Sequence, residues 1–263
     1  MGAVVMVDRF LLRRTLRSLC AGIVMAASAV VAHPAGAQGI GMEQLVEHMD
    51  WGRSSLVLID QLEYAPDAGG RMLSLDGTAW VGGAYNRVWF RTEGEQPLAG
   101  NGGEGELSVF YGRLVTPYWD AIAGVRVDGE WGEDPTARAS LAVGLIGLAP
   151  MRFEFSPTVF LSQDGDLSAR LEAEYQVLVT QRLVAEPEIE VNAALQEVPE
   201  FGIGSGLNDV EAGLRLRYEF SRKFAPYVGY TRSRLLGGSA DFARAEGEPT
   251  RESAVVAGLR VWF

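Results

Sequence analysis

The sequence predicts an all-β protein, a single transmembrane antiparallel up-and-down β-barrel of twelve strands. Runs in which apolar and charged residues alternate recur along most of the chain, which is the pattern of strands with two different faces. A secretory signal precedes these runs, and no later apolar stretch reaches the roughly 20 residues of a spanning helix. Sheets of this kind, with no helices to cover them, can close into a barrel whose apolar face meets lipid.

The chain begins with a predicted signal peptide, residues 1–37. Arginines at positions 9, 13, 14 and 17 precede the apolar run Leu19–Ala32, and an A-x-A cleavage site ends at Ala37. The arginine pair also suits twin-arginine export, but that route carries folded cargo, so general secretion fits a lipid-facing barrel better. Cleavage removes Cys20, the only cysteine, so we expect no disulfide in the mature chain.

A short polar segment, residues 38–55, follows the signal, and we expect it to form a periplasmic tail, or a plug at the mouth, of a barrel formed by residues 56–263. The segment contains Met42, His48 and Met49, three potential metal ligands within eight residues. The two methionines also sit at helical spacing with Leu45 and Val46, so the alternative is that they pack against the barrel.

The clearest strand pair is Arg170–Ala193, two alternating runs joined by a short turn near Gln181. In both runs the odd positions are apolar and the glutamates occupy even positions. The first strand is the least regular, because Asp60 falls among leucines, and a bulge is expected there. The predicted strands are Leu56–Tyr64, Arg71–Val81, Asn86–Glu93, Glu104–Leu114, Tyr118–Asp128, Arg138–Leu148, Arg152–Leu161, Leu167–Thr180, Leu183–Ala193, Asn208–Phe220, Ala225–Ser233 and Ser253–Phe263.

The connections alternate in length, as they do in outer-membrane barrels with short periplasmic turns and longer external loops. Counting back from Phe263, the predicted periplasmic turns span two to four residues. The last strand is amphipathic and ends on that aromatic residue, which looks like the recognition signal of outer-membrane barrels. Together with the signal peptide it predicts the outer membrane of a Gram-negative bacterium, with lipid as a partner. The predicted external loops are 65–70, 94–103, 129–137, 162–166, 195–207 and 234–252, of which the first and fourth are short.

The chain is acidic, with a formal net charge of −11, and loss of the signal makes it more so. This acidity disfavours nucleic acid and anionic surfaces as partners. It is compatible with cation binding, although an acidic surface that serves only solubility is the alternative.

Charged residues of both signs occupy the strand faces predicted to line the barrel interior. A narrow interior favours a structural network of ion pairs, because an unpaired charge away from water is costly. A path for a charged solute is the alternative. The charged residues singled out for the lumen are Glu172, Glu174, Glu188, Glu190, Arg215 and Arg217.

These four glutamates are expected to face one another in two pairs across the central hairpin. A tight turn near Gln181 places Glu174 opposite Glu188, and the same register pairs the glutamates at 172 and 190. Facing carboxylates need a cation. Arg215 or Arg217 on the next strand is a better candidate for that cation than a metal ion.

Catalysis finds little support in the residues. A serine nucleophile activated by histidine needs an imidazole within reach, and the only histidine after the signal is His48, ahead of the first strand. This argues against a lipase-type barrel such as outer-membrane phospholipase A. An aspartate-based barrel protease is not excluded, but no paired acids at the predicted outer rim support it.

Eight stretches, which together cover nearly the whole chain from Asp60 onward, carry a recognisable pattern. They are DQLEY (60–64), WVGGAYNRVWFRTEGE (80–95), YGRLVTPYWDAIAGVRVD (111–128), GLIGLAP (144–150), EAEYQVLVTQRLVAEPEIEVNA (172–193), GIGSGLNDVEAGLRLRYEFSRKFAPYVGY (202–230), GGSADFARAEGE (237–248) and VAGLRVWF (256–263). In combination these stretches resemble the copper resistance protein B family of bacterial outer membranes. The resemblance implies an outer-membrane barrel linked to copper tolerance, with copper ions as bound cargo and periplasmic copper-handling proteins as partners.

One departure from that family concerns the copper ligands. Members of the family commonly carry a long Met- and His-rich segment before the barrel, and thioether and imidazole groups suit Cu(I) and Cu(II). Here the segment is reduced to Met42, His48 and Met49. Three functions therefore remain: a barrel that binds copper or helps to export or sequester it, a narrow solute or ion channel without a copper role, and, least favoured, an enzyme.

Overall fold

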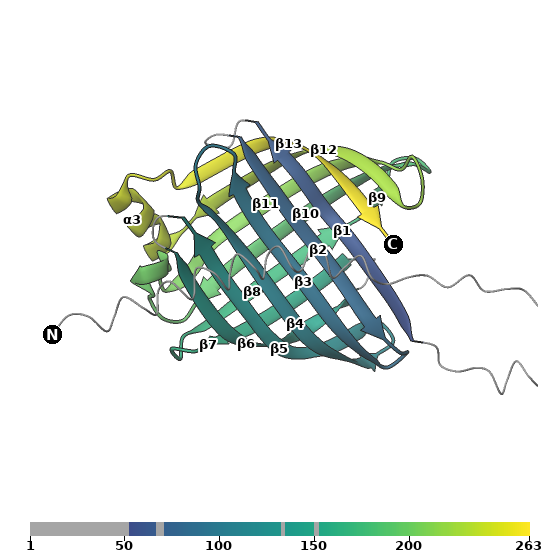
Figure 1. Ribbon diagram of the computed structural model, residues 1–263, viewed down its shortest axis with the longest axis horizontal. Helices are drawn as coiled ribbons and strands as arrows, with labels where there is room; N and C mark the ends of the chain where they lie inside the picture. The colour runs from purple at the N-terminus through teal and green to yellow at the C-terminus, as the bar shows by residue number, and fades with distance from the viewer. Residues whose placement is uncertain (1–52, 67–70, 133–134, 150–152) are drawn as a thin grey trace, which may run out of the picture. The chain divides into compact units, whose positions relative to one another are not determined.

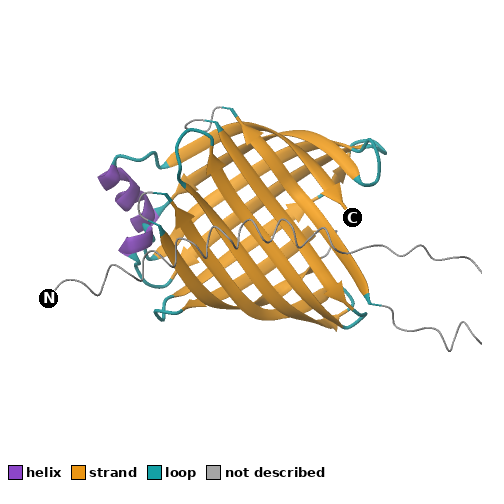
Figure 2. Ribbon diagram, in the orientation of Figure 1, coloured by secondary structure: helices purple, strands orange, loops and turns teal. Residues whose placement is uncertain are grey.

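The computed structural model describes residues 53–66, 71–132, 135–149 and 153–263. Within these residues the chain forms one closed antiparallel β-barrel, shown in Figures 1 and 2. The predicted signal peptide and almost all of the segment 38–55, with Met42, His48 and Met49, lie outside the described residues.

All twelve strands predicted from the alternation are present, and their ends differ from the prediction by at most four residues. One of them is interrupted at Gln176, so its two parts, β8 and β9, pair with the same neighbour in one register. The strands are β1 (Ser54–Ala65), β2 (Met72–Gly82), β3 (Asn86–Pro97), β4 (Gly103–Thr116), β5 (Trp119–Trp131), β6 (Thr136–Ala149), β7 (Phe153–Ser162), β8 (Leu167–Tyr175), β9 (Val177–Leu178), β10 (Leu183–Ala194), β11 (Gly206–Tyr218), β12 (Phe224–Leu235) and β13 (Arg251–Trp262).

Each strand pairs with the strands next to it in sequence, and the pairing of β1 with β13 closes the ring. Closure leaves no sheet edge, which is the requirement for a sheet that crosses lipid. The hairpin register is the predicted one, with Glu174 opposite Glu188 and Glu172 opposite Glu190.

The predicted bulge in β1 is present and determines which residues of that strand enter the barrel. Ile59 pairs with Gly77 and Gln61 with Asp76, so Asp60 is an extra residue. Side-chain direction alternates along a strand, and one extra residue reverses the alternation. As a result Asp60 and Gln61 both line the lumen, while the apolar residues at 62 and 64 face outward.

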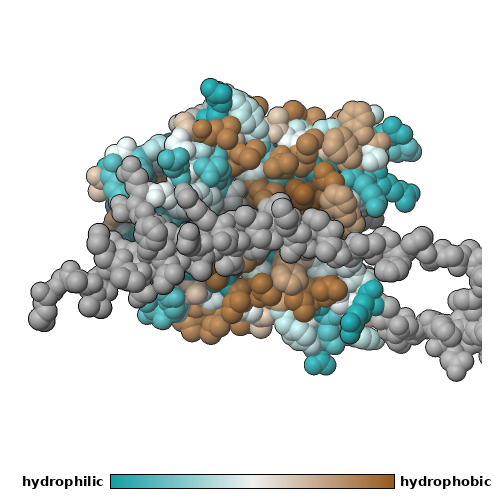
Figure 3. Space-filling view, viewed as in Figure 1, coloured by the Kyte–Doolittle hydropathy of each residue, from teal (hydrophilic) through white to brown (hydrophobic). Residues whose placement is uncertain are grey.

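The outer face of the barrel is apolar. Leu141 and Val143 of β6 are 60% and 63% exposed, and Val125 of β5 and Val228 of β12 are also exposed on this surface. Figure 3 shows hydrophobic side chains gathered over the strands, between more hydrophilic regions at the two ends of the barrel. This is the surface that a lipid-facing barrel requires.

One part of the lumen is filled by apolar side chains rather than by water. Phe110, Ile122, Ala142 and Phe160, from β4 to β7, form a buried cluster inside the wall. Beside the cluster, a glycine lets the backbones of β4 and β5 lie close together. At Gly124 of β5 an added Cβ would lie 1.9 Å from the backbone oxygen of Val109, so no larger residue fits. The open part of the lumen therefore lies toward the other strands.

The long loops carry helical structure that the sequence did not predict. The helix α3 (Gly237–Glu246) lies in the connection between β12 and β13, and the 3₁₀ turn η3 (Pro199–Phe201) lies between β10 and β11. The two loops meet closely, since the backbone N–H of Gly204 donates to Ser239 Oγ at 2.9 Å. None of the helices in the described residues is long and apolar enough to cross a membrane.

Candidate functional site: the charged lumen

A cavity of about 760 Å³ extends through the open part of the barrel. Leu56 and Trp262 line it near the short-turn end, and Glu95 and Glu252 line it near the loop end. Because the cavity contacts both ends, the side chains along it determine what the lumen can hold or pass.

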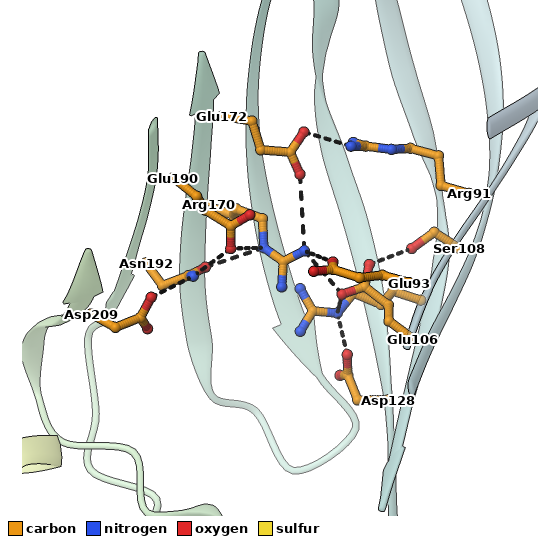
Figure 4. Close-up of polar contacts among 11 residues, drawn as sticks. Arg91, Glu93, Glu106, Ser108, Asp128, Arg170, Glu172, Glu190, Asn192 and Asp209 are labelled. Atoms are coloured by element: carbon orange, nitrogen blue, oxygen red, sulfur yellow. Dashed lines mark hydrogen bonds and ion pairs between the residues drawn. The ribbon is translucent and has the colours of Figure 1, made fainter. Parts of the chain in front are cut away.

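Arg170 of β8 is the centre of a network in the loop-end half of the lumen (Figure 4). Its Nη1 lies 3.3 Å from a carboxylate oxygen of Glu93 and 3.1 Å from one of Glu106, and its Nε lies 3.2 Å from Glu190. These contacts join β8 to β3 and β4, which are not its neighbours in the sheet, so they bridge the interior. A guanidinium with several planar donors suits such a position.

Arg91 and Arg126 extend this network. Arg91 Nη2 lies 2.6 Å from Glu172 Oε2, which links β3 to β8. Arg126 lies 3.3 Å from Glu106 and 2.5 Å from Asp128, and its guanidinium carbon sits 4.3 Å from the ring centroid of Phe160. The guanidinium of Arg126 therefore packs against the apolar cluster and neutralises the carboxylates of Glu106 and Asp128.

A second network surrounds Arg215 of β11, which is almost fully buried. Its Nε donates to Glu63 at 2.5 Å and its Nη2 donates to Gln61 at 2.8 Å, and Nη1 forms an ion pair with Glu188. Gln61 in turn donates to Glu188 at 3.2 Å. The bulge in β1 makes these contacts feasible, because it brings Gln61 and Glu63 to the lumen side.

Glu186 of β10 accepts hydrogen bonds from two arginines near the short-turn end. Arg217 Nη1 lies 2.8 and 2.7 Å from its two oxygens, and Arg260 Nη1 lies 2.8 Å from Oε1. Arg260 also binds Asp60 at 2.9 Å. Buried charges of both signs are thus joined across β10, β11, β13 and β1.

The six charged residues predicted for the lumen all belong to these networks or to the cavity wall. Arg215 binds Glu188, one of the facing glutamates, whereas Arg217 binds Glu186 instead. Glu172 is paired with Arg91. The positive and negative residues on the predicted lumen faces therefore form mainly ion pairs.

Sequence reasoning missed Asp60, Glu63 and Glu106 as lumen residues. The first two were hidden by the bulge, since an unbroken alternation would turn Glu63 toward lipid. The alternation in its strand could have identified Glu106, because it shares a face with Phe110 while Leu107 points the other way. Its contact with Arg170 depends instead on the approach of two strands that are not neighbours in the sheet.

The described residues offer almost no soft metal ligands. They contain no histidine and no cysteine, and Met72 is their only methionine. Met72 packs against Ala65, Ala254 and Val256. No group of three or more His, Cys, Asp or Glu residues suited to a metal ion occurs in this part of the chain. What the barrel itself offers to a cation is carboxylate oxygen.

Comparison with known proteins identifies the family. The model of the copper resistance protein B precursor family matches residues 53–263. The chain belongs to the copper resistance protein B family. It is 42% identical to copper resistance protein B of Escherichia coli over 208 residues, which cover 79% of this chain and 69% of that protein. A copper resistance protein B homolog of Pseudomonas syringae pv. tomato is 39% identical over 210 residues, covering 80% and 70%.

Solved structures of outer-membrane porins also align with this chain, at low sequence identity. The NanC porin aligns with a TM-score of 0.49 and 12% identity, covering 79% of this chain and 99% of the porin. The KdgM porin aligns with a TM-score of 0.48 and 10% identity, covering 79% and 98%.

Membership in the copper resistance protein B family confirms two expectations. The protein is an outer-membrane β-barrel, and it has a role in copper resistance. The family and the fold also favour a non-enzymatic protein.

Proposed function

We propose that this protein contributes to copper resistance by binding copper ions directly, at a site formed by Met42, His48 and Met49. The observation that supports the proposal is the distribution of ligand types. Thioether and imidazole groups, which copper prefers, are concentrated before the first strand, whereas the described barrel offers only Met72 besides oxygen ligands.

Met72 is a poor copper ligand in its present surroundings. It is partly buried against Ala65, Ala254 and Val256, so its sulfur belongs to an apolar contact rather than to a group of donors. The lumen carboxylates are harder ligands, and many of them are already neutralised by arginine. Specific copper binding is therefore assigned to the N-terminal segment, whose ions periplasmic copper-handling proteins would supply or receive.

The alternative for the segment is a packing role, in which its methionines contact the barrel without binding metal. The two roles differ in their dependence on sulfur and imidazole. A metal site loses its function when the donor atoms are removed, whereas a packing contact tolerates apolar residues of similar size such as leucine.

The test is the amount of copper bound per refolded mature protein after equilibration with Cu(I) and, separately, with Cu(II). The variant Met42→Leu/His48→Leu/Met49→Leu keeps the apolar character of the segment and removes its donors. We expect this variant to lose bound copper, while the control Met72→Leu binds as much as the wild type. Equal copper in the triple variant would refute the assignment to the segment, as would absence of copper from the wild type.

A further inference from the structure

The four arginines that line the lumen cavity are all neutralised by carboxylates. Arg87 lies 2.8 Å from Asp120, and Arg91 lies 2.6 Å from Glu172. Arg215 and Arg260 each bind two carboxylates, as described above. Among the described residues the cavity wall therefore presents no free guanidinium to a passing anion.

Carboxylates are far more numerous on the same wall. Of the described residues, thirteen acidic side chains line the cavity, against four basic ones. Five of these acids have no ion pair or hydrogen bond within the described structure, and they occur at different heights. They are Glu154 near the short-turn end, Asp76 and Glu211 midway, and Glu95 and Glu252 near the loop end.

The pairing of the strands explains why carboxylates outnumber arginines in the middle of the lumen. Glu172, Glu190 and Glu211 stand directly opposite one another on β8, β10 and β11. Arg91 and Arg170 pair with the first two, and Glu211 is left over. On the other side of the cavity, Asp76 of β2 stands between Gln61 and Glu93, neither of which is a cation.

These charges surround the space in which an ion would move. The cavity volume of about 760 Å³ has room for water and small ions, and acidic side chains line it from the short-turn end to the loop end. Narrow passages lined by one sign of charge concentrate the opposite ion and exclude ions of the same sign.

We propose that the lumen is a cation-selective aqueous passage, in which the carboxyl groups of Asp76 and Glu211, which have no direct ion pair or hydrogen bond within the described structure, set the selectivity at mid-height. The ion-pair networks have a complementary role, because they neutralise each arginine that the described part of the chain places on the wall and so weaken the attraction for anions. The inference does not depend on the copper ligands proposed above, since it concerns small cations in general and is tested without copper.

The experiment measures the reversal potential of the refolded mature protein in a planar lipid bilayer under a potassium chloride gradient. We expect potassium to permeate more readily than chloride, by about fivefold or more for a passage lined by acidic residues. In the double variant Asp76→Asn/Glu211→Gln the permeability ratio should fall at least about twofold, because both substitutions remove negative charge at nearly constant volume. Circular dichroism checks that the variant is folded.

The matched control is Glu246→Gln/Glu248→Gln, which removes two exposed carboxylates from the external loop and leaves the cavity unchanged. We expect its permeability ratio to equal that of the wild type. A wild-type protein that conducts no ions, or that prefers chloride, would overturn the proposal. A folded Asp76→Asn/Glu211→Gln variant with unchanged selectivity would overturn the assignment to these two residues.

Discussion

Arg217 binds Glu186 through a single nitrogen that lies 2.8 and 2.7 Å from the two carboxylate oxygens, and both side chains are buried. Arg260 adds a third contact at 2.8 Å. Glu186 is therefore the shared acceptor of two arginines that have little access to water. Breaking a buried ion pair from one side leaves uncompensated charge, which is much more damaging than loss of a surface pair.

Replacement of Glu186 should therefore destabilise the barrel strongly. We expect Glu186→Gln to lower the free energy of unfolding by about 3 kcal/mol, because Arg217 loses its main charged partner and Arg260 loses one of two. Urea unfolding in lipid vesicles measures the effect.

Glu219 supplies the matched control for that substitution. It lies 3.8 Å from the same arginine, but its side chain is 40% exposed. We expect Glu219→Gln to change the free energy of unfolding by less than about 1 kcal/mol. Equal effects of the two substitutions would contradict a special role for the buried carboxylate.

The bulge in β1 predicts how the barrel responds to deletion of a single residue. Removal of Asp60 leaves an unbroken alternation from Leu58 through Glu63, with the same residues facing the lumen, so we expect the deletion variant to form a barrel. Strand β2 has no bulge, so deletion of Thr78 would reverse the side-chain direction of the residues on one side of the deletion. We expect this variant not to fold.

Folded and unfolded barrels are distinguished in this experiment by gel electrophoresis, in which unheated and boiled samples of a folded barrel migrate differently, and by protease resistance. Failure of the Asp60 deletion to fold, at a level of expression where the wild type folds, would show that the bulge has a further structural role. Normal folding of the Thr78 deletion would contradict the register argument.

The packing of the two long loops depends on Gly204. An added Cβ there would lie 2.4 Å from the backbone nitrogen of Ser239 and 2.5 Å from Cα of Gly238, so even alanine must displace α3. We expect Gly204→Ala to raise the rate of trypsin cleavage after Arg244 by about tenfold, since the helix loses its contact with the neighbouring loop.

Gly83 is the control for the loop experiment. It has no atom within 4 Å of an added Cβ, and it lies in a turn at the opposite end of the barrel. We expect Gly83→Ala to leave cleavage after Arg244 unchanged. Unchanged cleavage in Gly204→Ala as well would show that the two loops are not held together by this contact.

The strands of the barrel could be predicted from sequence because the lipid imposes a strict alternation, and each strand repeats it. The turn near Gln181 even gave the pairing of Glu174 with Glu188. A charged residue among leucines indicated the bulge at Asp60. It did not indicate which residues after the bulge face the lumen, so the inward direction of Glu63 could not be predicted.

Contacts across the lumen could not be predicted in the same way. Arg170 meets Glu93 and Glu106 because strands far apart in sequence face each other inside a narrow barrel, and that approach depends on the stagger of the whole ring. The helix α3 was missed for a different reason. Its sequence is rich in Gly, Ala and charged residues, without the apolar stripe that marks a helix.

The most direct test of the account is copper tolerance in cells that lack their own copy of the gene. Cells that express the wild-type protein should grow at copper concentrations that stop cells without it. Cells that express the variant Met42→Leu/His48→Leu/Met49→Leu, at an equal level in the outer membrane, should lose most of that tolerance. Full tolerance with the triple variant would contradict the proposal that copper binding by this segment is how the protein confers resistance.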